Sequence, residues 1–411
     1  MHHPKGDTQA DFIRLDETGD VGTLCIAPDV SDSLLLTGDS QGDTPTFTLS
    51  RLNSDGSEKL LATHSFGDDE ELFFGLSAHV SPDQTIFLAG ALWGDDLYPA
   101  VARMKATGPL DTSFGDHGVR IFRDLTASRA PTAGISSHQK RGAKLNATHG
   151  SPSHTTRVVL PDGGYLVASA ETGYLLRITH DGELDASFAG GGKLLPTPPG
   201  VADFELTNAT LRGDNIILLI GNSGSKGIVA SYDLSGQPTD GFLDQAVVEI
   251  EHEEGVNLRN LSFSPDGKVL NIVGMTYVSG QRRGLLARID AYKGSADAMF
   301  NNGQPFHLTF ENQETSFLQV ASRLNQDQEE RIYAVGGRLA FPTPGYIAAA
   351  FDKRGLANDD FLDGVATGTE TTMATSVALL QAPPRLVIGG GVRRKDSGDS
   401  QGFVAIHPLS A

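Results

Sequence analysis

The chain has 411 residues and a formal net charge of −19, with 48 glycines and a single cysteine. This charge argues against broad nucleic-acid binding, which needs a basic surface, and one cysteine excludes an internal disulfide. No apolar run approaches the ~20 residues of a membrane helix, so we expect no membrane span, and the negative charge favours a soluble monomer.

The N-terminal segment is polar. Residues 1–16 lack the apolar stretch of a secretory signal peptide, so we expect the chain, as encoded, in the cytoplasm. Export by a route other than Sec, and a secreted form from which a leader has been removed, stay open. The segment ADFIRLDETG at 10–19 resembles a single strand, and we expect it to complete the last repeat of the chain.

Short apolar, strand-like runs that end in a small residue recur along the rest of the chain. The small residues are Gly38, Gly90, Ser169, Gly221, Gly274, Gly336 and Gly389. Five of the six spacings between them fall between 52 and 62 residues, and the sixth is 79. A fixed period of this kind indicates a solenoid or a propeller.

Each repeat has the same internal order. A first strand-like stretch and a turn rich in Pro, Asp and Gly precede the apolar run, as at 160–164 and 264–268. A variable loop, a second apolar run and a last strand follow it. Four short strands per repeat are typical of a propeller blade. The sequence therefore predicts an all-β, seven-bladed β-propeller in one domain over 1–411, closed by the N-terminal strand.

A motif lies between the third and fourth strands of several blades. It reads LDTSFGDHG at 110–118, LDASFAGGG at 184–192 and ADAMFNNG at 296–303, with variants at 239–245 and 358–364. We expect its Asp to accept backbone N–H bonds within the turn and Phe114, Phe188 and Phe300 to pack between neighbouring blades. Gly118 and Gly192 would allow a positive φ before the last strand. This structural role is favoured over a repeated ligand site.

The motif LDxSFGxxG followed by a strand resembles the delta-sixty repeat, a bacterial β-propeller family. The match is best in the second blade, weaker in the third and partial in the fourth to sixth. The resemblance implies a propeller, often part of a large surface or secreted bacterial protein. It implies no catalytic residue, because the family motif is structural.

Loops between second and third strands should gather on one face of a propeller. They are expected at 38–45, 93–99, 276–283, 338–345 and 392–401, with a flexible insertion at about 128–157 on the same face. Arginine and aromatic residues are enriched at binding sites, and a guanidinium suits carboxylate and phosphate groups. The candidate ligand-binding residues are Trp93, Tyr98, Arg141, Tyr277, Arg282, Arg283, Arg338, Phe341, Arg393 and Arg394.

These candidates predict a non-catalytic recognition module that binds an anionic small molecule, a glycan or a protein partner on the loop face. Two alternatives stay open. One is a propeller enzyme, a hydrolase or lyase, with convergent carboxylates or histidines at the channel mouth. The other is a scaffold domain in a secretion or toxin-like assembly. No motif for a nucleophile, a metal or a cofactor is found, so no catalytic residue, metal ligand or cofactor is predicted.

Overall fold

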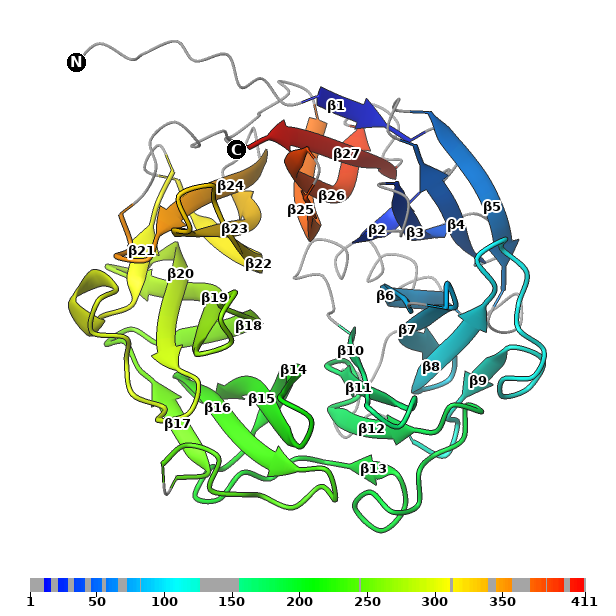
Figure 1. Cartoon of the computed structure of the whole chain (residues 1–411), viewed down its shortest axis with the longest axis horizontal. Coiled ribbons are helices and arrows are strands. Elements are labelled where there is room, and N and C mark those ends of the chain that lie inside the picture. The colour runs from blue at the N-terminus through cyan, green and yellow to red at the C-terminus, as the bar shows by residue number, and fades with distance from the viewer. Residues whose placement is uncertain are drawn as a thin grey trace.

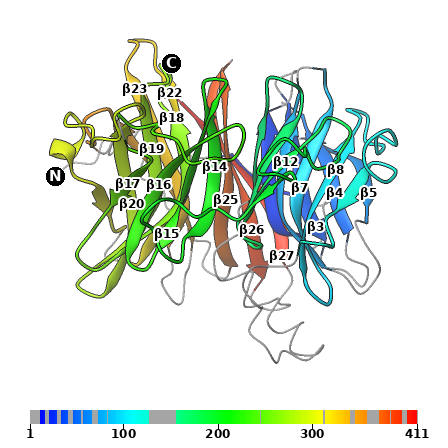
Figure 2. The same ribbon diagram turned by 90° about the horizontal axis from the view of Figure 1, so that it is seen from below.

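The computed structural model describes residues 11–15, 21–28, 33–40, 46–53, 57–65, 72–81, 83–125, 155–243, 245–310, 313–338, 345–356, 370–381, 383–394 and 400–409. Their strands form seven antiparallel sheets that stand around one centre (Figure 1). From the side, the strands run between two rims of the ring (Figure 2). The predicted seven-bladed propeller is confirmed.

The first three blades follow the chain from its N-terminal end. Blade one contains β2 (Val21–Pro28), β3 (Leu34–Ser40), β4 (Thr46–Leu52) and β5 (Glu58–His64). Blade two contains β6 (Leu72–Val80), β7 (Ile86–Trp93), β8 (Leu97–Met104) and β9 (Val119–Ile121). Blade three contains β10 (Thr155–Val159), β11 (Tyr165–Ser169), β12 (Tyr174–Ile178) and β13 (Lys193–Leu194).

The remaining blades complete the ring. Blade four contains β14 (Glu205–Arg212), β15 (Ile216–Ser223), β16 (Lys226–Asp233) and β17 (Val247–Ile250). Blade five contains β18 (Val256–Phe263), β19 (Val269–Val278), β20 (Gln281–Asp290), the 3-10 turn η1 (Asn301–Gly303) and β21 (Phe306–Leu308). The described part of blade six contains β22 (Thr315–Leu324), β23 (Glu330–Arg338) and β24 (Gly345–Asp352). Blade seven contains β25 (Glu370–Gln381), β26 (Pro384–Arg394) and β27 (Ser400–Pro408).

The N-terminal strand β1 (Asp11–Arg14) closes the ring. It pairs antiparallel with β27, with Phe12 opposite Ala405, and so adds the fourth strand to blade seven. Figure 1 shows β1 beside β27 on the outside of this blade. The predicted closure is confirmed. The motif variant at 358–364, which follows β24, lies outside the described residues.

In blades one to six, spatial order equals chain order and the first strand is the innermost, whereas in blade seven β25 is innermost and β1 outermost (Figure 1). Because the strands are antiparallel, the turns from second to third strand share one end of the ring with the links between blades. We call this end the hairpin rim; it includes residues 94–96, 170–173, 224–225 and 279–280. The segments from third to fourth strand lie at the opposite end, which we call the staple rim.

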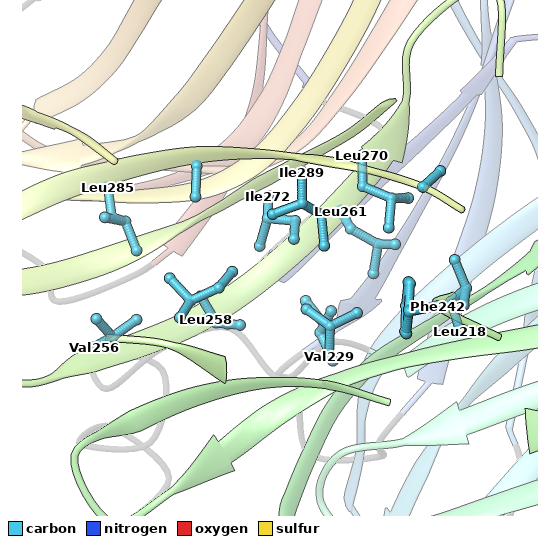
Figure 3. Close-up of a cluster of buried hydrophobic side chains, with 14 residues drawn as sticks. Leu218, Val229, Phe242, Val256, Leu258, Leu261, Leu270, Ile272, Leu285 and Ile289 are labelled. Carbon is cyan, nitrogen blue, oxygen red and sulfur yellow. The ribbon is translucent and has the colours of Figure 1, made fainter. Parts of the chain in front are cut away.

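The core lies between blades. Side chains alternate across each sheet, so Leu218 and Ile220 of β15 pack towards blade five, while Ile217 and Leu219 pack towards blade three. Figure 3 shows the apolar cluster between blades four and five, in which Phe242 and Leu258 contribute from either side. Such two-faced burial explains the nearly continuous apolar runs of the second and third strands.

The sequence suggested that the repeated small residue ends the second strand. This holds for Ser169 in blade three, but in the other six blades the residue lies inside the strand. In blade five the register skips Arg259, so a bulge in β18 faces Gly274 of β19. A Cβ atom on Gly274 would lie 2.1 Å from the backbone oxygen of Asn257. A Cβ atom added to Gly221 or Gly336 would likewise lie 2.2 or 2.0 Å from a backbone oxygen of the inner strand. Glycine is therefore needed where the inner strand bulges, and the second strand continues beyond it.

The motif at 184–192 fastens blade three to blade four. Asp185 Oδ1 accepts the backbone N–H and the hydroxyl of Ser187 at 2.9 and 2.6 Å, and its other oxygen lies 2.8 Å from Arg177 Nε. The Phe188 ring is fully buried. The next backbone N–H, of Ala189, donates to Ser235 O of blade four at 2.8 Å. The predicted structural role of the motif is confirmed, and we call this arrangement the staple.

Other blades repeat the staple. The corresponding ion pairs are Arg103 with Asp111 at 2.8 Å and Arg288 with Asp297 at 3.3 Å, and the corresponding buried rings are Phe114 and Phe300. In the following blade, a glycine at positive φ faces each ring: Gly182, Gly236 and Gly355. Gly118 and Gly192 also adopt the expected positive φ, at 102° and 77°.

Candidate functional site

The structure places the predicted ligand-binding residues in several different surroundings. Arg141 and Phe341 lie outside the described residues. Trp93, Arg393 and Arg394 are the last residues of their strands, β7 and β26, and are placed by their backbone alone. The expected insertion also lies largely outside the described residues, and 155–157 belong to β10.

Two further candidates do not join the others at one site. Tyr98 is half-buried in β8, where the Arg123 guanidinium lies 5.5 Å from its ring centroid. Blade two is across the ring from blade five (Figure 1). Arg338 was expected in an exposed loop but ends β23, is 4% exposed and packs 5.7 Å from the Phe310 ring centroid. The expectation was wrong because β23 continues past Gly336.

The remaining three candidates share the hairpin of β19 and β20, with Tyr277 and Arg282 on one face and Arg283 on the other. They were expected in a loop, but the strands continue to a turn at Ser279 and Gly280, both at positive φ. Glu254, in the link before β18, accepts the backbone N–H groups of both turn residues. These hydrogen bonds lower the pKa of the Glu254 carboxyl, which therefore stays ionised and holds the hairpin in place.

The face of the hairpin towards blade six carries an aromatic–arginine pair. Tyr277 and Arg282 are opposite each other in the ladder, and the guanidinium carbon lies 6.0 Å from the ring centroid. Both side chains are half-buried. The pair therefore presents a positive charge beside an aromatic ring at the hairpin rim.

Arg259 adds a second cation from the innermost strand of blade five. Burial lowers the pKa of its guanidinium, and the charge of Arg282 lowers it further, while Glu205 and Tyr277 oppose the shift. The effect of Arg282 means that the two guanidinium groups lie close enough to repel. An arginine pair of this kind stays charged at all ordinary pH values.

The guanidinium groups have unused donors. Within the described part of the chain, Nε of Arg259, Arg282 and Arg283 is buried and has no hydrogen-bond acceptor. A buried donor without an acceptor costs about 1–3 kcal/mol, so an oxyanion that reached these groups would gain both hydrogen bonds and charge neutralisation. The arrangement is suited to binding an anion.

Sequence reasoning missed Arg259. The predicted binding residues were charged and aromatic residues of expected loops, whereas Arg259 lies inside the strand VNLRNLSF (256–263). The available signal was a charged residue at the bulge of an inner strand, where blades four, six and seven carry Thr207, Leu318 and Thr375.

Two negative findings apply to the described ranges only. In them, no three His, Cys, Asp or Glu side chains gather into a group that could hold a metal ion. Nor does any helix there have the length and apolar character needed to cross a membrane.

No protein-family model matches the chain, and no curated protein matches it either. Among solved structures, a streptogramin B lyase superposes with a TM-score of 0.51 at 10% identity, covering 97% of each chain. Sqt1 from Chaetomium thermophilum superposes with a TM-score of 0.50 at 11% identity, covering 98% of each chain. At these identities the similarity shows the propeller fold alone.

Proposed function

We propose that this chain is a non-catalytic recognition module whose hairpin rim binds an anionic ligand at blade five. The supporting observation is the Arg259–Arg282 pair beside Tyr277, with buried Nε donors that have no acceptor among the described residues. In this proposal the ligand's carboxylate, sulfate or phosphate group lies between the guanidinium groups. A sugar ring of an acidic glycan then packs on Tyr277.

The chemistry of these side chains favours binding over catalysis. A guanidinium keeps one protonation state at ordinary pH, so it attracts and orients an anion but does not exchange protons with it. The strongly negative chain also makes a local cluster of arginines selective, because the rest of the surface repels the same ligand. The resemblance of the LDxSFGxxG motif to delta-sixty repeats agrees with a recognition role, since it adds no catalytic group.

The test is binding to an array of sialylated, sulfated and uronic-acid glycans, followed by calorimetry with the best ligand. Arg259→Gln and Arg282→Gln should each weaken binding about 10- to 100-fold, because each removes a charge-assisted hydrogen bond. The control is Arg354→Gln, which removes an exposed guanidinium paired with Asp352 at 3.0 Å on the staple rim. It should leave the affinity unchanged.

Three results would count against the proposal. The first is equal affinity of all three variants and the parent protein. The second is loss of binding together with a lower melting temperature, which would indicate damage to the fold. The third is cleavage of the bound glycan, which would identify an enzyme instead.

A further inference from the structure

The opposite face of the same hairpin carries a second polar group. Along β20, Leu285 packs towards blade four and Leu286 towards blade six, so Arg283 faces blade four while Arg282 faces away from it. On that side Arg283 meets two histidines. His252 lies in the link after β17, and His307 lies in the outermost strand β21, with their ring centroids 4.7 Å apart.

His307 is held in its neutral form. Burial, together with the neighbouring His252 and Arg283, lowers its pKa to about 4. Its Nδ1 atom is buried and finds no hydrogen-bond partner in the described ranges. The Nε atom of Arg283 is also buried and also has no hydrogen-bond partner there. Two buried nitrogen atoms without partners therefore lie on the same side of blade five, and the charge of Arg283 acts on His307.

The carboxylates around this group are engaged elsewhere. Glu254 accepts the two backbone N–H groups of the hairpin turn, and its own N–H donates to His252 Nδ1 at 3.4 Å. On blade four, Glu249 and Glu251 both hold Lys226, at 2.6 and 2.7 Å. The charge of Glu254 also acts on His252 and Arg283, but its oxygens are held by the turn, so a bound anion is the remaining acceptor for Arg283 Nε and His307 Nδ1.

We propose that Arg283, His252 and His307 form a second anion subsite, between blades four and five, that binds an oxyanion together with one proton on His307. The bound anion offsets the charge of Arg283 and supplies an acceptor for the imidazolium. Its presence therefore raises the pKa of His307, and binding takes up a proton from solution. The subsite is built from residues other than Arg259 and Arg282, so it can fail without affecting the proposed function.

The probe is sulfate, which stays a dianion between pH 5 and pH 8 and so cannot itself supply the proton. Calorimetry in two buffers of different ionisation enthalpy measures the protons taken up. If bound sulfate restores the ordinary His307 value of 6.5, binding at pH 5 should be about 20-fold tighter than at pH 7, with nearly one proton taken up. Histidine NMR signals should show His307 titrating near its lowered value without sulfate and at higher pH with it.

Variants separate the roles of the residues. In an Arg259→Gln/Arg282→Gln background, which removes the first anion site, Arg283→Gln should remove the remaining sulfate binding, and His307→Gln should keep weak binding without proton uptake. The control His117→Gln changes an exposed histidine on the staple rim and should behave as the parent protein. In this background, sulfate binding without proton uptake, or unaffected by Arg283→Gln, would overturn the proposal, as would an NMR titration of His307 that sulfate does not move. An Arg282→Gln variant should still bind sulfate at this subsite.

Discussion

The staple between blades three and four makes a quantitative prediction for the pair Phe188 and Gly236. The Phe188 ring is fully buried, so Phe188→Ala should cost about 3–5 kcal/mol of unfolding free energy. Gly236 has φ +84°, and a Cβ atom there would lie 3.1 Å from the Phe188 ring. Gly236→Ala should therefore cost about 1–2 kcal/mol for the left-handed conformation and about 1–3 kcal/mol more for the crowding.

The control for the conformational cost is Gly163→Ala. Gly163 has φ +81°, close to that of Gly236, but no atom lies within 4 Å of its added Cβ. In the double variant Phe188→Ala/Gly236→Ala the ring contact is gone and only the 3.1 Å contact with Ala189 Cβ remains, so the cost of the glycine change should fall towards that of Gly163→Ala. This difference is a coupling energy between the two positions.

Urea denaturation followed by circular dichroism supplies the measurement, with the unfolding midpoint and slope of each variant compared with the parent. The staple argument fails if Phe188→Ala costs less than about 1 kcal/mol, well below a buried phenylalanine. It also fails if Gly236→Ala costs the same with and without the ring, because the contact would then contribute nothing.

Three further predictions concern the fold. Gly274→Ala should cost more than about 3 kcal/mol in thermal unfolding, because its Cβ would lie 2.1 Å from Asn257 O, whereas Gly191→Ala, with no atom within 4 Å, should be nearly neutral. Removing β1 should lower the melting temperature and promote association through the exposed β27 edge, seen by light scattering; an unchanged monomer would contradict the closure. Burial raises the pKa of Glu171 to about 7 from 4.5, so the folded state keeps a proton that the unfolded state loses, and stability should fall as pH rises through this window. Glu171→Gln should abolish that fall and add about 1–3 kcal/mol at pH 8, while parallel pH profiles would refute it.

Much of the fold was predictable because one period runs along the chain. The recurrence of Gly221, Gly274 and Gly336 predicts the blades, and the LDxSF motif predicts the contacts between neighbouring blades. The same glycines misled the placement of loops. A glycine inside a strand looks like its end when the cause, a bulge in the neighbouring strand, leaves no mark of its own in the sequence.

The candidate site was predictable only where the chain itself brings residues together. Tyr277 and Arg282 are five positions apart, and a tight turn makes them neighbours. Arg259, His252 and His307 reach the same blade from an inner strand, a link and an outer strand, so no local pattern connects them. Arg338 shows the reverse error, since a basic residue beside an expected loop proved to be buried.

The placement of the staples has a consequence for protein engineering. The staples among the described residues lie at one rim, and each uses the backbone and side chains of the third-to-fourth strand segments. The short turns at 94–96, 224–225 and 279–280 emerge at the other end of the ring. New binding loops can therefore be grafted at several of those turns at once, while the staples keep the ring of sheets assembled.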